Sequence, residues 1–127
     1  MKEEKINKLK GKYINANTNN TFIILKTARK TIRYIEKNTI NFPNTYKVLR
    51  DKIIDSCYKI LEYIYRANIF QDINDKKEIV VNICMLNFYL EEAFIKKILT
   101  NKKYISYTSH LIELDKMVRS WFNYEKI

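Results

Sequence analysis

Apolar residues recur every three or four positions in four successive segments of this chain, which is the period of an amphipathic helix. The first segment begins at Thr21 and ends where "NTINFPNT" interrupts the pattern, because Pro43 cannot continue a helix. The second segment runs from about Tyr46 to Asn68. The pattern therefore predicts two helices in the first half of the chain.

The second half predicts two more helices. One follows "FQDIND", where Asp72 or Asn74 is the expected N-cap, and extends to about Leu99. "TNKKYI" is expected to form the next turn, and Ser106 or Thr108 is expected to cap the last helix. The apolar residues of that helix step by four, three, four and three positions: Tyr107, Leu111, Leu114, Val118 and Trp121. This spacing is typical of a helix in a bundle.

The composition favours the same fold class. A single Gly and a single Pro leave few positions for the tight turns of an all-β protein, and 127 residues suffice for one hydrophobic core. We therefore predict an all-α protein, an antiparallel up-down four-helix bundle formed by residues 20–127. Residues 1–19 have no sustained apolar period and are expected to form a basic, mobile N-terminal tail.

The third predicted helix is apolar over more than one face. Ile79, Ile83, Leu86, Leu90 and Phe94 form one stripe, and further apolar residues lie outside it: Val80, Met85, Phe88, Tyr89 and Ile95. A helix on the surface of a monomer needs only one apolar face. The surplus predicts either burial on two sides or contact with a second copy of the chain, so we expect a homo-oligomer.

Positive charge is concentrated near the N-terminus. The net charge is +10, and residues 1–40 contribute ten Lys and Arg against three acids, whereas the rest of the chain contributes fourteen against eleven. This asymmetry favours a polyanionic partner such as nucleic acid. A Lys-, Asn- and Ile-rich composition is also typical of an AT-rich genome, which is the alternative explanation of the excess.

The first predicted helix carries this charge on one side. Projected at about 100° per residue, its apolar residues lie opposite five basic residues that we call the basic stripe: Lys26, Arg29, Lys30, Arg33 and Lys37. Glu36 is the single acid between Asn20 and Asp51, so the five cations repel one another unless an anion faces them. We predict that the basic stripe contacts phosphates and that Tyr34 is the nearest candidate for stacking on a base. A solvated outer face is the alternative.

Catalytic and metal-binding patterns are missing from the sequence. His110 is the single histidine and has no nucleophile at a diagnostic spacing, and the chain has neither a Glu-x-x-His pair nor a Gly-rich phosphate loop. Cys57 and Cys84 have no CxxC spacing and are expected to be buried, reduced thiols. We therefore expect a protein without catalytic activity, cofactor or metal.

No segment has the features of a membrane span or a secretory signal. The longest apolar run without charge, Ile79 to Leu90, has twelve residues, and a bilayer span needs about twenty. The N-terminal "MKEEKINKLKGK" has no hydrophobic run. The expected location is the cytoplasm, without a membrane partner.

Two segments resemble a known family. "YIEKNTINFPNTYKVLRDKIIDSCYKILEYIYRAN" resembles the accessory variability determinant (Avd) proteins of diversity-generating retroelements in the turn between the first two helices and in the start of the second. The residues that match there are Phe42, Pro43, Leu49, Asp51, Lys52 and Ile53. "YISYTSHLIELDKMVRSWF" is similar to the last helix of the family, with Leu114, Met117 and Trp121 in register. The resemblance covers about residues 20–124.

The resemblance implies a small basic four-helix bundle that assembles as a homopentamer. It also implies binding to the reverse transcriptase of a retroelement and to its template RNA, in support of mutagenic retrohoming, without catalysis. A related branch of four-helix-bundle proteins, encoded in intervening sequences of rRNA genes, is the nearest alternative. Such a protein would be an oligomeric interaction module with no reverse transcriptase partner.

A third possibility is binding to an anionic membrane surface through the first helix. The apolar face of that helix would then have to leave the bundle, because it lies opposite the basic stripe. This requirement makes the membrane the least favoured partner.

Overall fold

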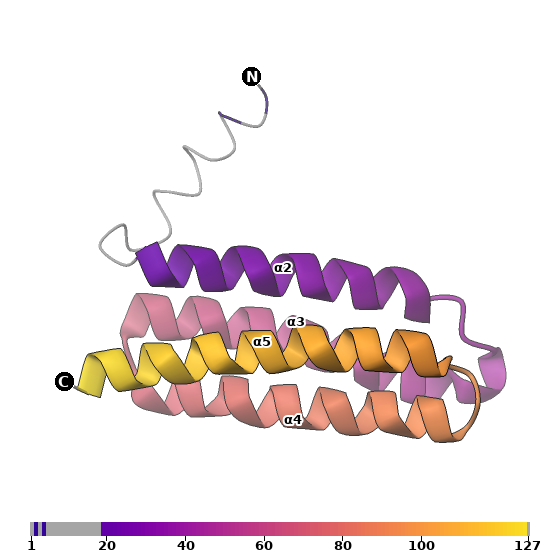
Figure 1. The fold of residues 1–127 in the computed structure, drawn as a ribbon. Helices are drawn as coiled ribbons and strands as arrows, with labels where there is room; N and C mark the ends of the chain where they lie inside the picture. Colours follow the sequence, from indigo (N-terminus) through magenta and orange to yellow (C-terminus); the bar gives the residue numbers. More distant parts are fainter. Residues whose placement is uncertain (1, 3, 5–18, 127) are drawn as a thin grey trace.

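The computed structural model describes residues 2, 4 and 19–126, and the regular structure in this part of the chain is entirely helical. Four long helices lie side by side (Figure 1). They are α2 (Asn19–Thr39), α3 (Lys47–Phe70), α4 (Ile73–Ile95) and α5 (Asn101–Lys126), and a short 3-10 helix, η1 (Asn44–Tyr46), precedes α3. The protein is therefore all-α, and its helices pack in the manner of a bundle. The predicted tail, residues 1–19, lies almost wholly outside the described residues.

The breaks between the first three helices follow from local chemistry. Pro43 adopts φ −54° and ψ 147°, an extended conformation that separates α2 from η1. The α3 helix ends at Gln71, whose φ of 53° lies in the left-handed region and whose N–H donates to the Ala67 carbonyl at 2.9 Å. Asp72 then caps α4, because its carboxylate accepts a hydrogen bond from the Asn74 N–H at 2.9 Å. Of the two N-caps predicted for this helix, Asp72 is the correct one.

The start of the last helix was predicted wrongly. The α5 helix begins at Asn101, so the "TNKKYI" segment is mostly helical and Ser106 and Thr108 lie inside the helix. Thr100 takes the capping role instead. Its hydroxyl accepts from the Lys103 N–H at 3.2 Å, and its carbonyl accepts from the Tyr104 N–H at 2.9 Å. The early start of α5 brings Ser106 and Thr108 onto surfaces that face other helices.

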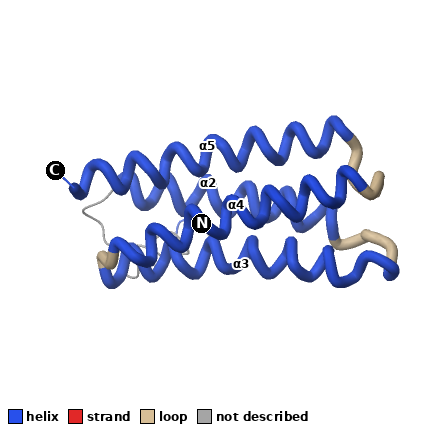
Figure 2. The backbone as a smooth tube through the Cα atoms, turned by 90° about the horizontal axis from the view of Figure 1, so that it is seen from below, coloured by secondary structure: helices blue, strands red, loops and turns tan. Residues whose placement is uncertain are grey.

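Each long helix contacts two others. The contacting pairs are α2 with α3, α3 with α4, α4 with α5, and α5 with α2, which closes a ring of helices around one core. The connections that follow α2 and α4 lie at one end of the molecule, and the connection that follows α3 lies at the other end (Figure 2). The first residue of α2 and the last residue of α5 also lie at that second end (Figure 1).

The core is formed by the apolar faces that the helical period predicts. Ala28, Ile35, Ile60, Leu90 and Tyr107 have no exposed surface, and they come from all four helices. The two cysteines differ from each other. Cys57 is buried, as predicted, whereas Cys84 is exposed, so its predicted burial was wrong. Cys84 lies one position after Ile83, which faces the core, and the rotation of 100° per residue turns it outward.

Within the described part of the chain, no helix is long and apolar enough to cross a membrane.

Candidate nucleic-acid interface

The α2 helix is fixed in place by its apolar face. Ile24, Leu25 and Ile32 are at most 3% exposed, and Thr39 is buried with its hydroxyl donating to the Ile35 carbonyl at 2.9 Å. Neighbours on both sides, α3 and α5, cover this face. The opposite side of α2 is therefore held toward the outside of the bundle.

The basic stripe occupies this outer side. Lys26, Lys30, Arg33 and Lys37 are exposed, and Arg29 is half-buried. None of the five side chains forms an ion pair or a hydrogen bond with another described residue. At about 1.5 Å of rise per residue, the stripe is about 16 Å long. It presents a row of positive charges without a carboxylate between them.

The single acid of α2 is engaged elsewhere. Glu36 is half-buried, and its carboxylate accepts a hydrogen bond of 2.7 Å from the hydroxyl of Tyr58 on α3. That hydrogen bond, together with desolvation and the negative charge of Glu36, raises the pKa of Tyr58 above its ordinary value. The partner of Glu36 is thus an uncharged phenol, and no Lys or Arg of the basic stripe is neutralised by it.

Charges on the other three helices are arranged differently. Three acids, one each on α3, α4 and α5, pair with the basic residue four positions later: Asp55 with Lys59 at 3.2 Å, Glu92 with Lys96, the C-cap of α4, at 3.0 Å, and Asp115 with Arg119 at 2.8 Å. Such pairs are typical of solvated helix faces. Other exposed lysines, among them Lys52, Lys77 and Lys102, also have no ion pair in the described structure, so α2 is distinguished by the alignment of five cations on one face.

Tyr34, the predicted stacking residue, lies one turn from Lys30 and Lys37 at the edge of the basic stripe that faces α5, and it packs against that helix. Its hydroxyl lies 3.3 Å from the Ser106 hydroxyl, and its ring meets the rings of Tyr107 and His110 edge-on at centroid distances of 5.0 Å and 5.5 Å. Tyr34 is still 37% exposed. The ring therefore ties α2 to α5, and its role in stacking stays a prediction.

Tyr107 is the buried member of this aromatic group. The residue has no exposed surface, and this burial is the main reason that the pKa of the Tyr107 hydroxyl rises to about 12. The nearby Tyr34 is a second cause of the rise. The Asn38 side chain lowers this pKa in part, although the Tyr107 hydroxyl makes no hydrogen bond of good geometry within the described structure. The hydroxyl is therefore protonated at neutral pH.

His110 is half-buried beside Tyr34, and no hydrogen bond joins it to Ser106 or to any other described side chain. No group of three His, Cys, Asp or Glu side chains in the described residues is placed to hold a metal ion.

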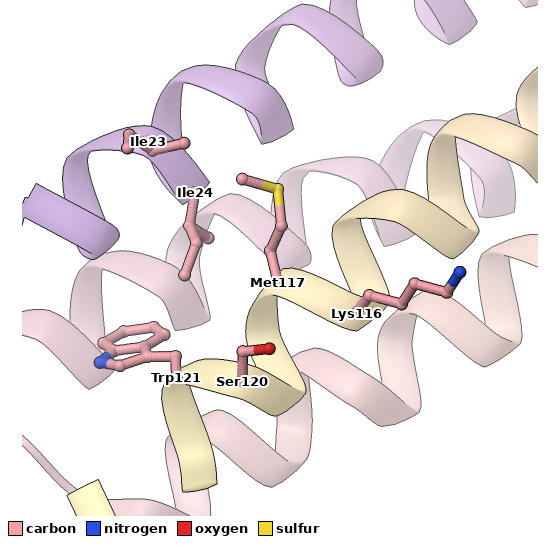
Figure 3. A pocket seen from close by; sticks show the side chains of 6 residues that line it. All are labelled: Ile23, Ile24, Lys116, Met117, Ser120 and Trp121. Carbon is pink, nitrogen blue, oxygen red and sulfur yellow. The ribbon is translucent and has the colours of Figure 1, made fainter. Parts of the chain in front are cut away.

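An open pocket of about 320 Å³ lies between α2 and α5, near the start of α2. It is lined by Ile23, Ile24, Lys116, Met117, Ser120 and Trp121. Figure 3 shows Ile24 and Met117 directed into the space between the two helices, whereas Lys116 extends away along α5. The lining is mainly apolar and includes no carboxylate or imidazole, so the pocket has no acid–base pair.

One residue near the basic stripe was missed by the sequence analysis. Tyr58 is 50% exposed, and its hydrogen bond to Glu36 places it beside α2. Its position in the amphipathic pattern of α3, two residues before Ile60 of the core, could have indicated exposure. The contact with Glu36 depends on how α2 and α3 pack, and no spacing in the sequence gives it.

A scan against protein-family models and a search of curated proteins found no match to this chain. Its function therefore has to be inferred from its own residues and their arrangement.

Proposed function

We propose that this protein is a non-enzymatic, nucleic-acid-binding accessory subunit, and that the basic stripe binds the phosphates of RNA. The observation that carries the proposal is the alignment of five basic side chains on one outer face of α2, none of which has an ion pair within the described structure: Lys26, Arg29, Lys30, Arg33 and Lys37. A row of basic side chains along one helix face can bind a phosphate backbone but has little capacity to read base edges. Binding is therefore tolerant of sequence.

The proposal extends to the retroelement that the resemblance suggests. In it, the chain supports mutagenic retrohoming by binding template RNA and a reverse transcriptase, in the cytoplasm and without a cofactor. A neighbouring reverse-transcriptase gene with paired template and variable repeats would support this assignment. Absence of such a gene, with an insertion in an rRNA gene instead, would favour the alternative branch.

The assembly that we propose is a homopentamer of antiparallel up-down bundles. The antiparallel order is supported by the placement of successive connections at alternate ends of the molecule (Figure 2). Self-association is supported by the outer face of α4, where Val81, Met85, Phe88 and Ile95 are between 39% and 59% exposed. Light scattering tests this part, and a monomer at micromolar concentration would contradict it.

The same apolar face favours the second candidate function, an oligomeric interaction module of the rRNA intervening-sequence type without a reverse transcriptase. The two functions differ in what the basic stripe does. In the first it binds RNA, and in the second it is only a solvated surface.

An RNA titration at several salt concentrations separates the two. In the test variant, Arg29, Lys30 and Arg33 are replaced with Glu, and in the control variant the same reversal is made at Lys52, Lys77 and Lys102. These control lysines are exposed, lie on α3, α4 and α5, and have no ion pair in the described structure. Both variants change the net charge equally, so the comparison isolates the position of the charge.

We expect the test variant to bind RNA weakly and with a flatter dependence on salt. Each lost phosphate contact reduces the slope of log affinity against log salt by about 0.7 for a single strand, so three contacts reduce it by about 2 per protomer. The control variant should keep a slope near that of the wild type. Circular dichroism would show that both variants remain helical, since the apolar face of α2 is unchanged. Equal slopes in all three proteins would mean that the basic stripe faces only water.

A further inference from the structure

Tyr58 combines exposure, an aromatic face and proximity to unpaired positive charge. Half of the residue is exposed, and its hydroxyl reaches across the α2–α3 contact to Glu36 at 2.7 Å. On α2, Glu36 lies three positions after Arg33 and seven after Arg29, so the three side chains project from the same side of the helix. Tyr58 is therefore located at the edge of the basic stripe that faces α3.

The hydrogen bond holds the Tyr58 side chain in position. An exposed tyrosine without a partner samples several rotamers, and ordering it on binding costs free energy. Here a charged acceptor, the Glu36 carboxylate at 2.7 Å, already holds the hydroxyl end. The ring is thus ordered before any ligand arrives.

We propose that Tyr58 is a base-stacking residue, and that Tyr58 with Arg29 and Arg33 forms a binding site for single-stranded nucleic acid. This inference rests on the proposed function, since the basic stripe supplies the contacts to the phosphates. Proteins that bind single strands combine such a charged track with aromatic rings on which unpaired bases stack. Tyr34 meets this need less well, because Tyr107 and His110 already contact its ring.

The chemistry of the site favours a single strand over a duplex. A base inside a duplex is stacked on both faces and cannot offer one to Tyr58 without being unstacked, which costs free energy. Glu36 also disfavours a phosphate at the hydroxyl end of the tyrosine. The backbone is therefore expected to follow Arg29 and Arg33 while one unpaired base reaches the ring.

The experiment compares three substitutions in the full chain. Tyr58→Leu removes the ring, Tyr58→Phe keeps the ring and removes the hydroxyl, and Phe70→Leu is the matched control. Phe70 is also an exposed aromatic residue of α3, at 65% exposure, but it lies twelve positions from Tyr58, about 18 Å along the helix. The probes are fluorescein-labelled 12-nucleotide oligouridylate, oligothymidylate and a 12-base-pair duplex.

We expect Tyr58→Leu to weaken binding of both single strands by about tenfold, which is the effect of losing one stacked base, and to change duplex binding by less than about twofold. Tyr58→Phe should keep most of the affinity, and Phe70→Leu should keep all of it. A strand that carries one 2-aminopurine should show quenched emission with the wild type and Tyr58→Phe, and less quenching with Tyr58→Leu. Comparing the affinities for oligouridylate and oligothymidylate shows whether the site prefers RNA or DNA.

The outcomes separate this inference from the proposed function. If charge reversal in the basic stripe weakens binding but Tyr58→Leu has the same affinity as Phe70→Leu, stacking is refuted and phosphate binding stands. Equal losses for single strand and duplex in Tyr58→Leu would also refute stacking. If the wild-type protein binds none of the probes, both proposals fail.

Discussion

Replacing Asp75 with Asn tests an ion pair that joins α3 to α4. The Nε atom of Arg66 lies 3.2 Å from Oδ1 of Asp75, and the guanidinium also lies 5.7 Å from the centre of the Phe70 ring. The i,i+4 spacing of Glu62 and Arg66 on α3 would also allow an ion pair within that helix. Among the described residues, the structure shows neither an ion pair nor a hydrogen bond between the side chains of Arg66 and Glu62.

The size of the effect follows from the burial of the two side chains. Arg66 is 51% exposed and Asp75 is 11% exposed at the side chain. Asp75→Asn leaves the arginine in contact with water, so the loss is near that of a surface pair, about 1 kcal/mol, plus about 0.5 kcal/mol for a carboxylate in the first turn of α4. Arg66→Met instead leaves a mostly buried carboxylate without its partner, and we expect a loss of about 2 kcal/mol.

The assay is urea unfolding of the wild type, both single variants and the double variant. The coupling energy between the two positions should be about 1 kcal/mol, and in thermal unfolding Asp75→Asn alone should lower Tm by about 6 °C. Glu62→Gln is the matched control and should change the free energy of unfolding by less than about 0.5 kcal/mol. A coupling energy of zero, or a Glu62→Gln effect as large as that of Asp75→Asn, would refute the assignment of Arg66 to Asp75.

Two further predictions concern the cysteines and the start of α5. Cys57 should react with a thiol reagent only on unfolding, because burial, helped by Glu36, raises the pKa of Cys57 from 9.0 to about 12. Cys84 is exposed on the outer face of α4, so it should react in the folded monomer and be protected where this face is covered in the proposed oligomer. The Cys57 thiol therefore loses its proton at lower pH in the unfolded chain than in the folded one, so the stability that depends on it is complete below about pH 9 and is lost as the pH rises to about 12. Cys57→Ala should lessen this loss of stability in unfolding measurements at high pH. An unchanged pH dependence in this variant would contradict the prediction. Thr100→Ala should lower the free energy of unfolding by about 1 kcal/mol because it removes the cap bond to Lys103, whereas Ser109→Ala, inside the helix with only a bond to the Ile105 carbonyl, should have little effect in the same urea assay. Equal effects of the two substitutions would show that Thr100 does not cap α5.

Local patterns in the sequence determined the helices and their inner faces. The period of Ile24, Ile32 and Ile35 on one side of α2 fixes which side is buried, because these residues share a face whatever the helix packs against. Pro43 interrupts the helical pattern after α2 through its extended backbone, and Asp72 starts α4 because its carboxylate caps the helix. The row of cations on α2 was visible for the same reason, since five positions on one helix need no partner to be aligned.

The start of α5 was harder to predict because several polar residues can cap a helix. Thr100, Ser106 and Thr108 all have a hydroxyl that could accept from a nearby N–H. The choice was made by packing: starting at Asn101 places Ser106 beside Tyr34 of α2 and lets Thr108 donate to the Asn87 side chain of α4 at 3.1 Å. These contacts are available only when the neighbouring helices are in place.

Contacts between helices were decided by the tertiary structure alone. Whether Arg66 binds Glu62 or Asp75, and whether Glu36 offsets a cation of the basic stripe or accepts from Tyr58, depends on the rotation and offset of α3 against its two neighbours. Periodicity gives the direction of a side chain from its own helix axis, but it contains no information about what lies at the same height on the next helix. The aromatic ring beside the basic stripe therefore emerged only when α2 and α3 were seen packed together.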